Sequence, residues 1–140
     1  MAIILVGGGS VAERLIGTME SRGHSVVLVT SDARNAEEFS FEFPGAMVIG
    51  GDARDPIVLK QAGAADAAFV VAASDDDAYN LSVCLLAREA FHVPAVIGLA
   101  GHPQNVRIFR ALEIPCISCS EIIADSVLET LEPRAAVVTG

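Results

Sequence analysis

The chain has 140 residues, the usual size of one domain, and its 52% hydrophobic and 19% charged residues argue against disorder. Nine basic and eighteen acidic residues give a formal net charge of −9, which makes nucleic acid and anionic lipid poor partners. No apolar run reaches the roughly 20 residues that span a bilayer, and the N-terminus lacks the basic flank of a signal peptide. We therefore expect a cytoplasmic protein that is not itself embedded in a membrane.

Apolar runs of strand length alternate with segments of helical period along the chain. In chain order we expect a strand at 2–6, a helix at 10–21, a strand at 25–30, a helix at 33–41, a strand at 46–50, a helix that begins at 56, a strand at 67–73, a helix at 77–91, a strand at 96–100, a helix that includes 106–112, a strand at 115–118 and a helix at 121–131. This alternation predicts an α/β fold, in which right-handed crossovers build a doubly wound parallel sheet of six strands with helices on both faces. We expect this domain to cover residues 1–132 and residues 133–140 to form a flexible tail.

A glycine-rich turn lies between the first predicted strand and the first predicted helix. It reads G-x-G-x-x-A: Gly7 allows the tight turn, Gly9 lets the backbone approach a pyrophosphate, and Ala12 lets the helix pack on the strand. The pyrophosphate would lie on the helix N-terminus, where unpaired N–H groups point at it. The pattern predicts a Rossmann-like nucleotide-binding fold with strand order 3-2-1-4-5-6, and a purely structural turn is the alternative. The residues that we expect in this part of the site are Gly7, Gly8, Gly9, Ser10 and Val11.

The end of the second strand leaves the identity of the cofactor open. NAD-binding folds place an acidic residue there to bind the ribose, whereas this chain has Thr30, followed by Ser31 and Asp32. Three interpretations stand: Ser31 or Asp32 caps the next helix, Asp32 contacts the ribose, or Thr30 and Ser31 hold a 2′-phosphate together with Arg34. We expect NAD(H) or NADP(H) as the cofactor, with ATP, ADP and AMP as alternatives.

Two further segments carry a resemblance to a known family. Residues 51–56 read Gly-Asp-Ala-Arg-Asp-Pro, and residues 73–77 read Ala-Ser-Asp-Asp-Asp with Asn80 three positions later. Together with the glycine turn, these segments resemble the TrkA-N family, also called RCK or KTN, over about residues 1–132. Its members are nucleotide-binding domains that regulate potassium channels and transporters.

The resemblance implies further site residues. By this resemblance Asp52 and Ala53 flank the adenine, and the loop of Ala73, Ser74, Asp75 and Asp76 lies over the ribose and phosphates. The sequence departs from the family in three places. Thr30 replaces the usual acid, and Ser10 and Leu99 stand where many members have arginine. Two missing cations weaken the case for a triphosphate ligand.

The acidic run and the thiols each have two interpretations. Residues 75–77 either cap the following helix or form a ligand-facing loop, because open α/β sheets bind ligands at the carboxyl ends of their strands. Cys116 and Cys119 have thioredoxin-like spacing, but Cys116 falls in a predicted strand, so we expect buried hydrophobic residues rather than a redox pair. The three histidines lie in different loops without metal-ligand spacing, and we expect no metal site.

The resemblance implies a function without catalysis. It indicates a regulatory domain that controls a membrane potassium channel or transporter by a ligand-dependent conformational change, and that forms a homodimer or a higher homo-oligomer. The apolar residues at 122–131 would serve such pairing, or would pack on the domain's own sheet. We see no catalytic residue set, since the only tyrosine is Tyr79 and the only lysine is Lys60. A small NAD(P)-dependent oxidoreductase or a subunit of one, and a degenerate scaffold without a ligand, are the alternatives.

Overall fold

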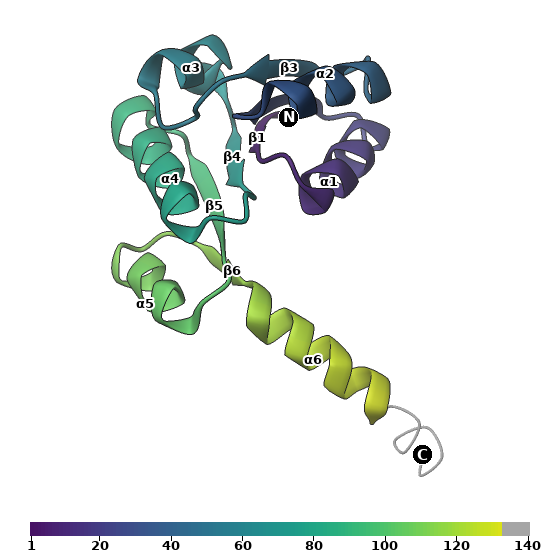
Figure 1. Cartoon of the computed structure of the whole chain (residues 1–140). Coiled ribbons are helices and arrows are strands. Elements are labelled where there is room, and N and C mark those ends of the chain that lie inside the picture. Colours follow the sequence, from purple (N-terminus) through teal and green to yellow (C-terminus); the bar gives the residue numbers. More distant parts are fainter. Residues whose placement is uncertain (133–140) are drawn as a thin grey trace.

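The computed structural model describes residues 1–132, in which a parallel sheet carries helices on both faces (Figure 1). The predicted tail at 133–140 lies outside the described residues. The six strands of this part pair in the order β3-β2-β1-β4-β5-β6, and all pairs are parallel, so the predicted fold and strand order are confirmed. In chain order the elements are β1 (Ala2–Val6), α1 (Ser10–Ser21), β2 (Ser25–Thr30), α2 (Ala33–Glu42), β3 (Met47–Gly50), α3 (Pro56–Gln61), the short 3-10 helix η1 (Ala64–Asp66), β4 (Phe69–Ala72), α4 (Asp77–Phe91), β5 (Ala95–Ala100), α5 (Pro103–Ala111), β6 (Cys116–Ser118) and α6 (Cys119–Leu131).

Several predicted boundaries differ from the structure by one to three residues, and two of these differences have local reasons. The fourth strand begins at Phe69 instead of residue 67, because η1 ends just before it. Helix α5 begins at Pro103, three residues earlier than the stretch predicted from its apolar positions. His102 is its N-cap and Pro103 its first residue, where proline's fixed φ suits a helix and its missing N–H costs nothing.

Two hydrophobic clusters lie on opposite faces of the sheet. On one face, the buried residues Ala12 and Ile16 of α1 and Phe39 of α2 pack against Leu5 and Leu28. On the other face, side chains of α3, α4 and α5 pack on the strands; the largest fully buried residues among them are Leu59, Val83 and Phe109. Both cores are almost entirely aliphatic, as expected of a sheet covered on both faces.

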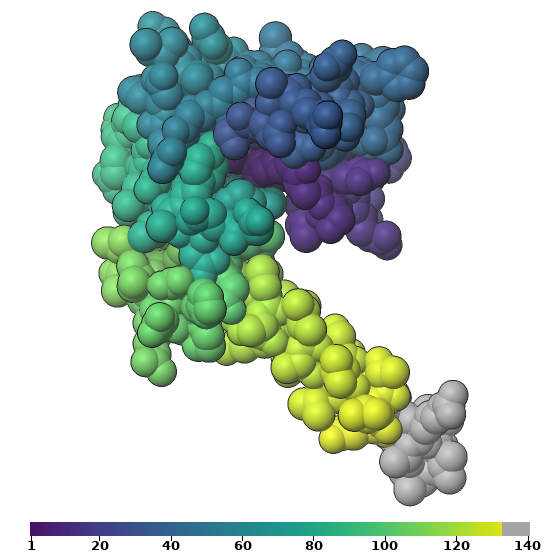
Figure 2. All heavy atoms as spheres, in the orientation of Figure 1, coloured from purple at the N-terminus to yellow at the C-terminus, as the bar shows by residue number. Residues whose placement is uncertain are grey.

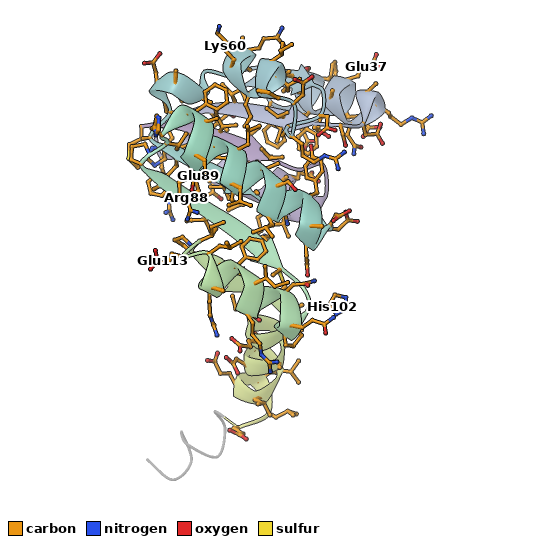
Figure 3. All side chains as sticks on the ribbon, turned by 90° about the vertical axis from the view of Figure 1, so that its left-hand side faces the viewer. Glu37, Lys60, Arg88, Glu89, His102 and Glu113 are labelled. Carbon is orange, nitrogen blue, oxygen red and sulfur yellow. The ribbon has the colours of Figure 1, made fainter. Side chains whose placement is uncertain are left out.

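Helices α4 and α5 are joined by polar contacts as well as by this core. Arg88 of α4 reaches the end of α5, where its Nη1 donates hydrogen bonds to the carbonyl oxygens of Leu112 at 2.7 Å and Glu113 at 3.3 Å (Figure 3). A cation at this position satisfies carbonyl groups that the end of a helix leaves unpaired.

Helix α6 projects away from the rest of the molecule (Figure 1). Within the described residues no side chain of α6 is buried. Its five large apolar side chains are between 49% and 70% exposed: Ile122, Ile123, Val127, Leu128 and Leu131. The alternative in which this helix packs on its own sheet is therefore wrong. Across residues 1–132, none of the helices has both the length and the apolar character that crossing a bilayer requires.

Candidate functional site

A cleft of about 580 Å³ lies at the carboxyl ends of the central strands. Figure 2 shows the molecule hollowed at this edge, between α1 and the residues that follow β4. Strands β2 and β4 flank β1 on its two sides, and their crossover helices lie on opposite faces of the sheet. This divergence opens a crevice next to the glycine turn, as the strand-order rule for such sheets predicts.

The structure places most of the expected site residues on this cleft and leaves four outside it. Those that line it are Gly7, Gly8, Gly9, Ser10, Val11, Thr30, Ser31, Asp32, Ala73, Ser74 and Asp75. The four expected residues that do not line it are Arg34, Asp52, Ala53 and Asp76.

Gly7 is held between three strands. Its N–H donates to the carbonyl oxygen of Val29 at 3.0 Å, and the N–H of Ala73 donates to Val6 at 2.7 Å. Its φ is +153°, and a Cβ built on it would lie 2.8 Å from the carbonyl oxygen of Ala73. The glycine is therefore required by the fold itself, because the turn passes directly over the end of β4.

Gly8 is restricted by two polar side chains, whereas Gly9 is not restricted by the protein. A Cβ on Gly8 would lie 2.8 Å from Oγ1 of Thr30 and 2.8 Å from Nδ2 of Asn35. A Cβ on Gly9 would meet no heavy atom of the described residues within 4 Å, and its φ of −99° suits any residue. Neither packing nor backbone strain accounts for a glycine at position 9. The empty space around it leaves room for a bound group to approach this backbone closely.

The N-terminus of α1 is open, unlike those of its neighbours. Asp32, Asp55 and Asp76 cap α2, α3 and α4 with their side chains. Gly9 is the N-cap of α1, and among the described residues no side chain caps this helix. The first N–H groups of a helix have no partner within it, and they carry the positive end of its dipole. A phosphate group fits the open N–H groups and the free space over Gly9.

The end of β2 resolves one of the open interpretations. Oδ1 of Asp32 accepts hydrogen bonds from the N–H groups of Arg34 at 2.8 Å and Asn35 at 3.4 Å, so Asp32 caps α2 as that interpretation requires. Asp32 also lines the cleft, and Arg34 does not. The three-residue cluster proposed for a 2′-phosphate thus has only Thr30 and Ser31 at the cleft.

The segment after β3 forms its own polar cluster beside the cleft. Arg54 binds Asp52 through two nitrogens, with Nη2 2.8 Å from Oδ2, and its guanidinium lies 4.9 Å from the centre of the Tyr79 ring. The hydrogen bond from Arg54 holds the pKa of Asp52 below its usual value. Ala53 is fully buried, and its N–H donates to the Tyr79 hydroxyl at 2.8 Å. Tyr79, not Asp52 or Ala53, presents this cluster to the cleft.

The acidic run divides into three roles. Asp76 caps α4 by accepting from the N–H of Tyr79 at 3.0 Å. Asp77 accepts from the N–H groups of Gly101 at 2.8 Å and His102 at 3.1 Å, and from Nδ2 of Asn105 at 2.8 Å. Burial raises the pKa of Asp77, but these hydrogen bonds outweigh it and lower the pKa overall. Asp77 thus ties the start of α4 to the start of α5, where His102 is the N-cap residue (Figure 3). Only Asp75 faces the cleft without such a partner among the described residues.

Asn80 fixes the loop that follows β4. Its Oδ1 accepts from the N–H and the hydroxyl of Ser74 at 3.0 and 2.7 Å, and its Nδ2 donates to the carbonyl oxygens of Ser74 at 2.9 Å and Leu99 at 3.0 Å. Asn80 is fully buried, with both faces of its amide satisfied. The asparagine of the acidic motif thus positions the Ser74–Asp75 wall of the cleft and does not itself line it.

Several lining residues were not predicted from the sequence. Asn35 and Tyr79 lie in the first turn of their helices. Leu99 lies within β5, Gly101 follows β5, and Cys119 follows β6. The expectation that Cys116 and Cys119 are buried is wrong, because both are only partly covered and Cys119 lines the cleft. β6 is an edge strand and α6 projects from it, so little covers them. Within residues 1–132 no cluster of His, Cys, Asp or Glu could hold a metal ion.

Comparison with known proteins identifies the family. The TrkA-N domain family matches residues 3–120, most of the chain. The chain belongs to the TrkA-N family. The potassium uptake protein TrkA homolog of Methanothermobacter thermautotrophicus is 31% identical over 137 residues, which make up 98% of this chain and 62% of that relative. The chain spans about 60% of the length of the first curated relatives that it matches. The family predicted from the sequence is confirmed.

Solved TrkA-N structures share the fold. The TrkA-N domain of the inner membrane protein ybaL from Escherichia coli has a TM-score of 0.84 at 18% identity, covering 94% of this chain and 96% of that one. The GsuK channel bound to NAD has a TM-score of 0.74 at 26% identity, covering 86% of this chain and 22% of that one. The GsuK structure bound to ADP has a TM-score of 0.76 at 24% identity, covering 86% of this chain and 32% of that one.

Proposed function

We propose that this TrkA-N domain is a regulatory module of a potassium transport system that changes conformation when an adenine nucleotide occupies the cleft. The observation that carries the proposal is the uncapped N-terminus of α1, which meets the cleft at Gly9, where the fold itself has no need of a glycine. Anions bind at such helix ends without a dedicated cation. NAD(H) and NADP(H) are the first candidates, and ATP, ADP and AMP the alternatives.

The comparisons support the same ligand class and the regulatory role. The GsuK channel has been solved with NAD and with ADP, and the curated relatives are named as potassium uptake proteins. In this proposal the partner is a membrane channel or transporter subunit, and the domain acts at its cytoplasmic side. A ligand can shift such a partner only through a difference in affinity between two conformations.

We further propose that the domain pairs with a second copy through α6. The five apolar side chains of that helix have no cover within the described residues, and contiguous exposed apolar surface of this kind marks an interaction site. Positions 123, 127 and 131 follow the spacing of one helix face, and 128 adjoins them. A second copy offers an identical apolar surface, which is the arrangement of a two-fold interface.

Calorimetry tests the ligand proposal directly. The chain is titrated with NAD, NADH, NADPH, ATP, ADP and AMP, and at least one is expected to bind once per chain and to raise the unfolding midpoint. If none binds, the proposal is wrong. Incubation with NADPH and a panel of carbonyl substrates separates regulation from catalysis: the proposal expects no oxidation of NADPH above the rate without protein, and sustained turnover would favour the oxidoreductase alternative.

A further inference from the structure

Tyr79 is the one aromatic side chain among the described residues that line the cleft. It lies in the first turn of α4, and its ring packs against the core on the face of the sheet that α3 and α4 cover. Helix α1 covers the opposite face. Tyr79 and the open N-terminus of α1 therefore border the cleft from different sides of the sheet.

The polar groups around Tyr79 are already engaged within the protein. Its hydroxyl oxygen accepts a hydrogen bond from the N–H of Ala53 at 2.8 Å, which ties the start of α4 to the segment after β3. The guanidinium of Arg54 lies 4.9 Å from the ring centre, and Asp52 matches its charge in an ion pair at 2.8 Å. Ala53, Arg54 and Asp52 all lie outside the lining. What this cluster offers to a ligand is therefore the ring of Tyr79.

The rest of the cleft wall offers a nucleotide base no comparable surface. Within residues 1–132 the lining contains no lysine, arginine or histidine, and apart from Tyr79 it consists of glycines, carboxylates and small polar or aliphatic residues. A purine base is a flat ring system, and flat rings pair with aromatic side chains in offset-stacked or edge-to-face arrangements. A base that enters this cleft thus finds its matching surface at Tyr79.

We propose that Tyr79 binds the purine base of the nucleotide through its ring, while the start of α1 binds the phosphates. This inference rests on the proposed function, because it concerns the ligand of the same cleft. The family resemblance places Asp52 and Ala53 beside the adenine, but in this chain neither residue lines the cleft. They are positioning residues for the ring: Ala53 acts through the hydroxyl, and Asp52 acts through Arg54.

Fluorescence of the wild-type chain tests the contact itself and needs no variant. Tyr79 is the only tyrosine and the chain has no tryptophan, so tyrosine emission reports on this position alone. The six candidate nucleotides all contain adenine, and each one that the wild type binds in calorimetry is titrated. Free N-acetyltyrosinamide, titrated in the same way, corrects for light that the nucleotide absorbs. A base in contact with the ring is expected to quench most of the emission at saturation.

Three variants separate the ring from its hydroxyl. Tyr79→Leu removes the ring and should weaken binding roughly 5- to 150-fold, the range that base–aromatic contacts contribute. Tyr79→Phe keeps the ring and loses only the hydrogen bond to Ala53, so it should bind about as tightly as the wild type. Phe41→Leu is the matched control, because this ring is 92% exposed on α2 and lies outside the cleft lining. Unfolding midpoints check that each variant is folded.

The outcomes distinguish this inference from the proposed function. Emission that stays unchanged at saturation, or a Tyr79→Leu chain that binds as tightly as the wild type, would overturn the role of Tyr79 and leave the proposed function standing. Tyr79→Phe binding as weakly as Tyr79→Leu would assign the effect to the hydroxyl, and Phe41→Leu binding as weakly would remove its specificity; either result contradicts the ring contact. A wild-type chain that binds none of the six nucleotides would overturn both proposals together.

Discussion

Replacing Gly9 by serine should strengthen the fold and weaken ligand binding at once. The backbone of Gly9 has φ −99° and ψ −167°, which serine adopts freely, and a Cβ there meets no described atom within 4 Å. Losing a glycine's freedom in the unfolded chain stabilises a protein by about 0.4–1 kcal/mol, and serine as N-cap adds a few tenths. We expect the free energy of unfolding to rise by about 0.5–1 kcal/mol, a shift of roughly 2–5 °C in the midpoint.

The same substitution should damage the site. The serine hydroxyl takes an N–H group that the phosphate needs, and its Cβ occupies the approach to the backbone. A hydrogen bond to a charged group contributes about 1.5–3 kcal/mol, so affinity for the ligand found by calorimetry should fall roughly 10- to 100-fold.

Thermal unfolding and calorimetry on the same samples check both halves. Gly17→Ala is the control: it lies in the middle of α1, where a Cβ would be 3.6 Å from Phe43, an ordinary contact. It should stabilise the helix by about 0.5–1 kcal/mol and leave affinity unchanged. If Gly9→Ser binds as tightly as the wild type, the phosphate does not approach Gly9. If it loses more than about 1 kcal/mol of stability, the fold needs this glycine after all.

Three other predictions concern the frame of the site and the pairing helix. Asn80→Ala should cost about 2–4 kcal/mol in urea unfolding, because it empties a fully buried position and leaves partly buried groups of Ser74 and Leu99 without partners, and a loss below 1 kcal/mol would show that the amide is dispensable. The pKa of Asp77 is lower in the folded chain than its usual 3.8, so the stability that its ionised form contributes is present above pH 3.8 and is lost as pH falls through the folded pKa. Asp77→Asn should therefore flatten the decline in unfolding free energy below about pH 4. An unchanged slope in that variant would contradict this prediction. Leu128→Glu should convert the pair into single chains in sedimentation with little change in the unfolding midpoint, and a wild type that sediments as a single chain at every concentration would contradict pairing through α6.

Local sequence signals predicted the central part of the site well. The glycine turn predicted the strand order and the position of the cleft, because tight turns at this point of a parallel sheet restrict residue type strongly. The caps formed by Asp32 and Asp76 were likewise among the interpretations drawn from the sequence, since an aspartate before a helix satisfies its first N–H groups.

Features that depend on packing between distant elements were not predicted. Asn35 and Tyr79 line the cleft because the packing of α2 and α4 on the sheet brings their first turns to it. The role of Asp77 in holding the start of α5 depends on residues 24 to 28 positions later. The apolar positions of α6 have the spacing of a core helix, and that spacing does not distinguish packing on its own sheet from exposure for a partner.

The most direct test of the central claim is a crystal structure of the chain with the ligand that calorimetry identifies. We predict the diphosphate on the open N-terminus of α1, with its oxygens within hydrogen-bond distance of the N–H groups of Ser10 and Val11 and against the backbone of Gly9. A ligand bound elsewhere on the domain, with the Gly7–Val11 turn making no contact to phosphate, would contradict the account.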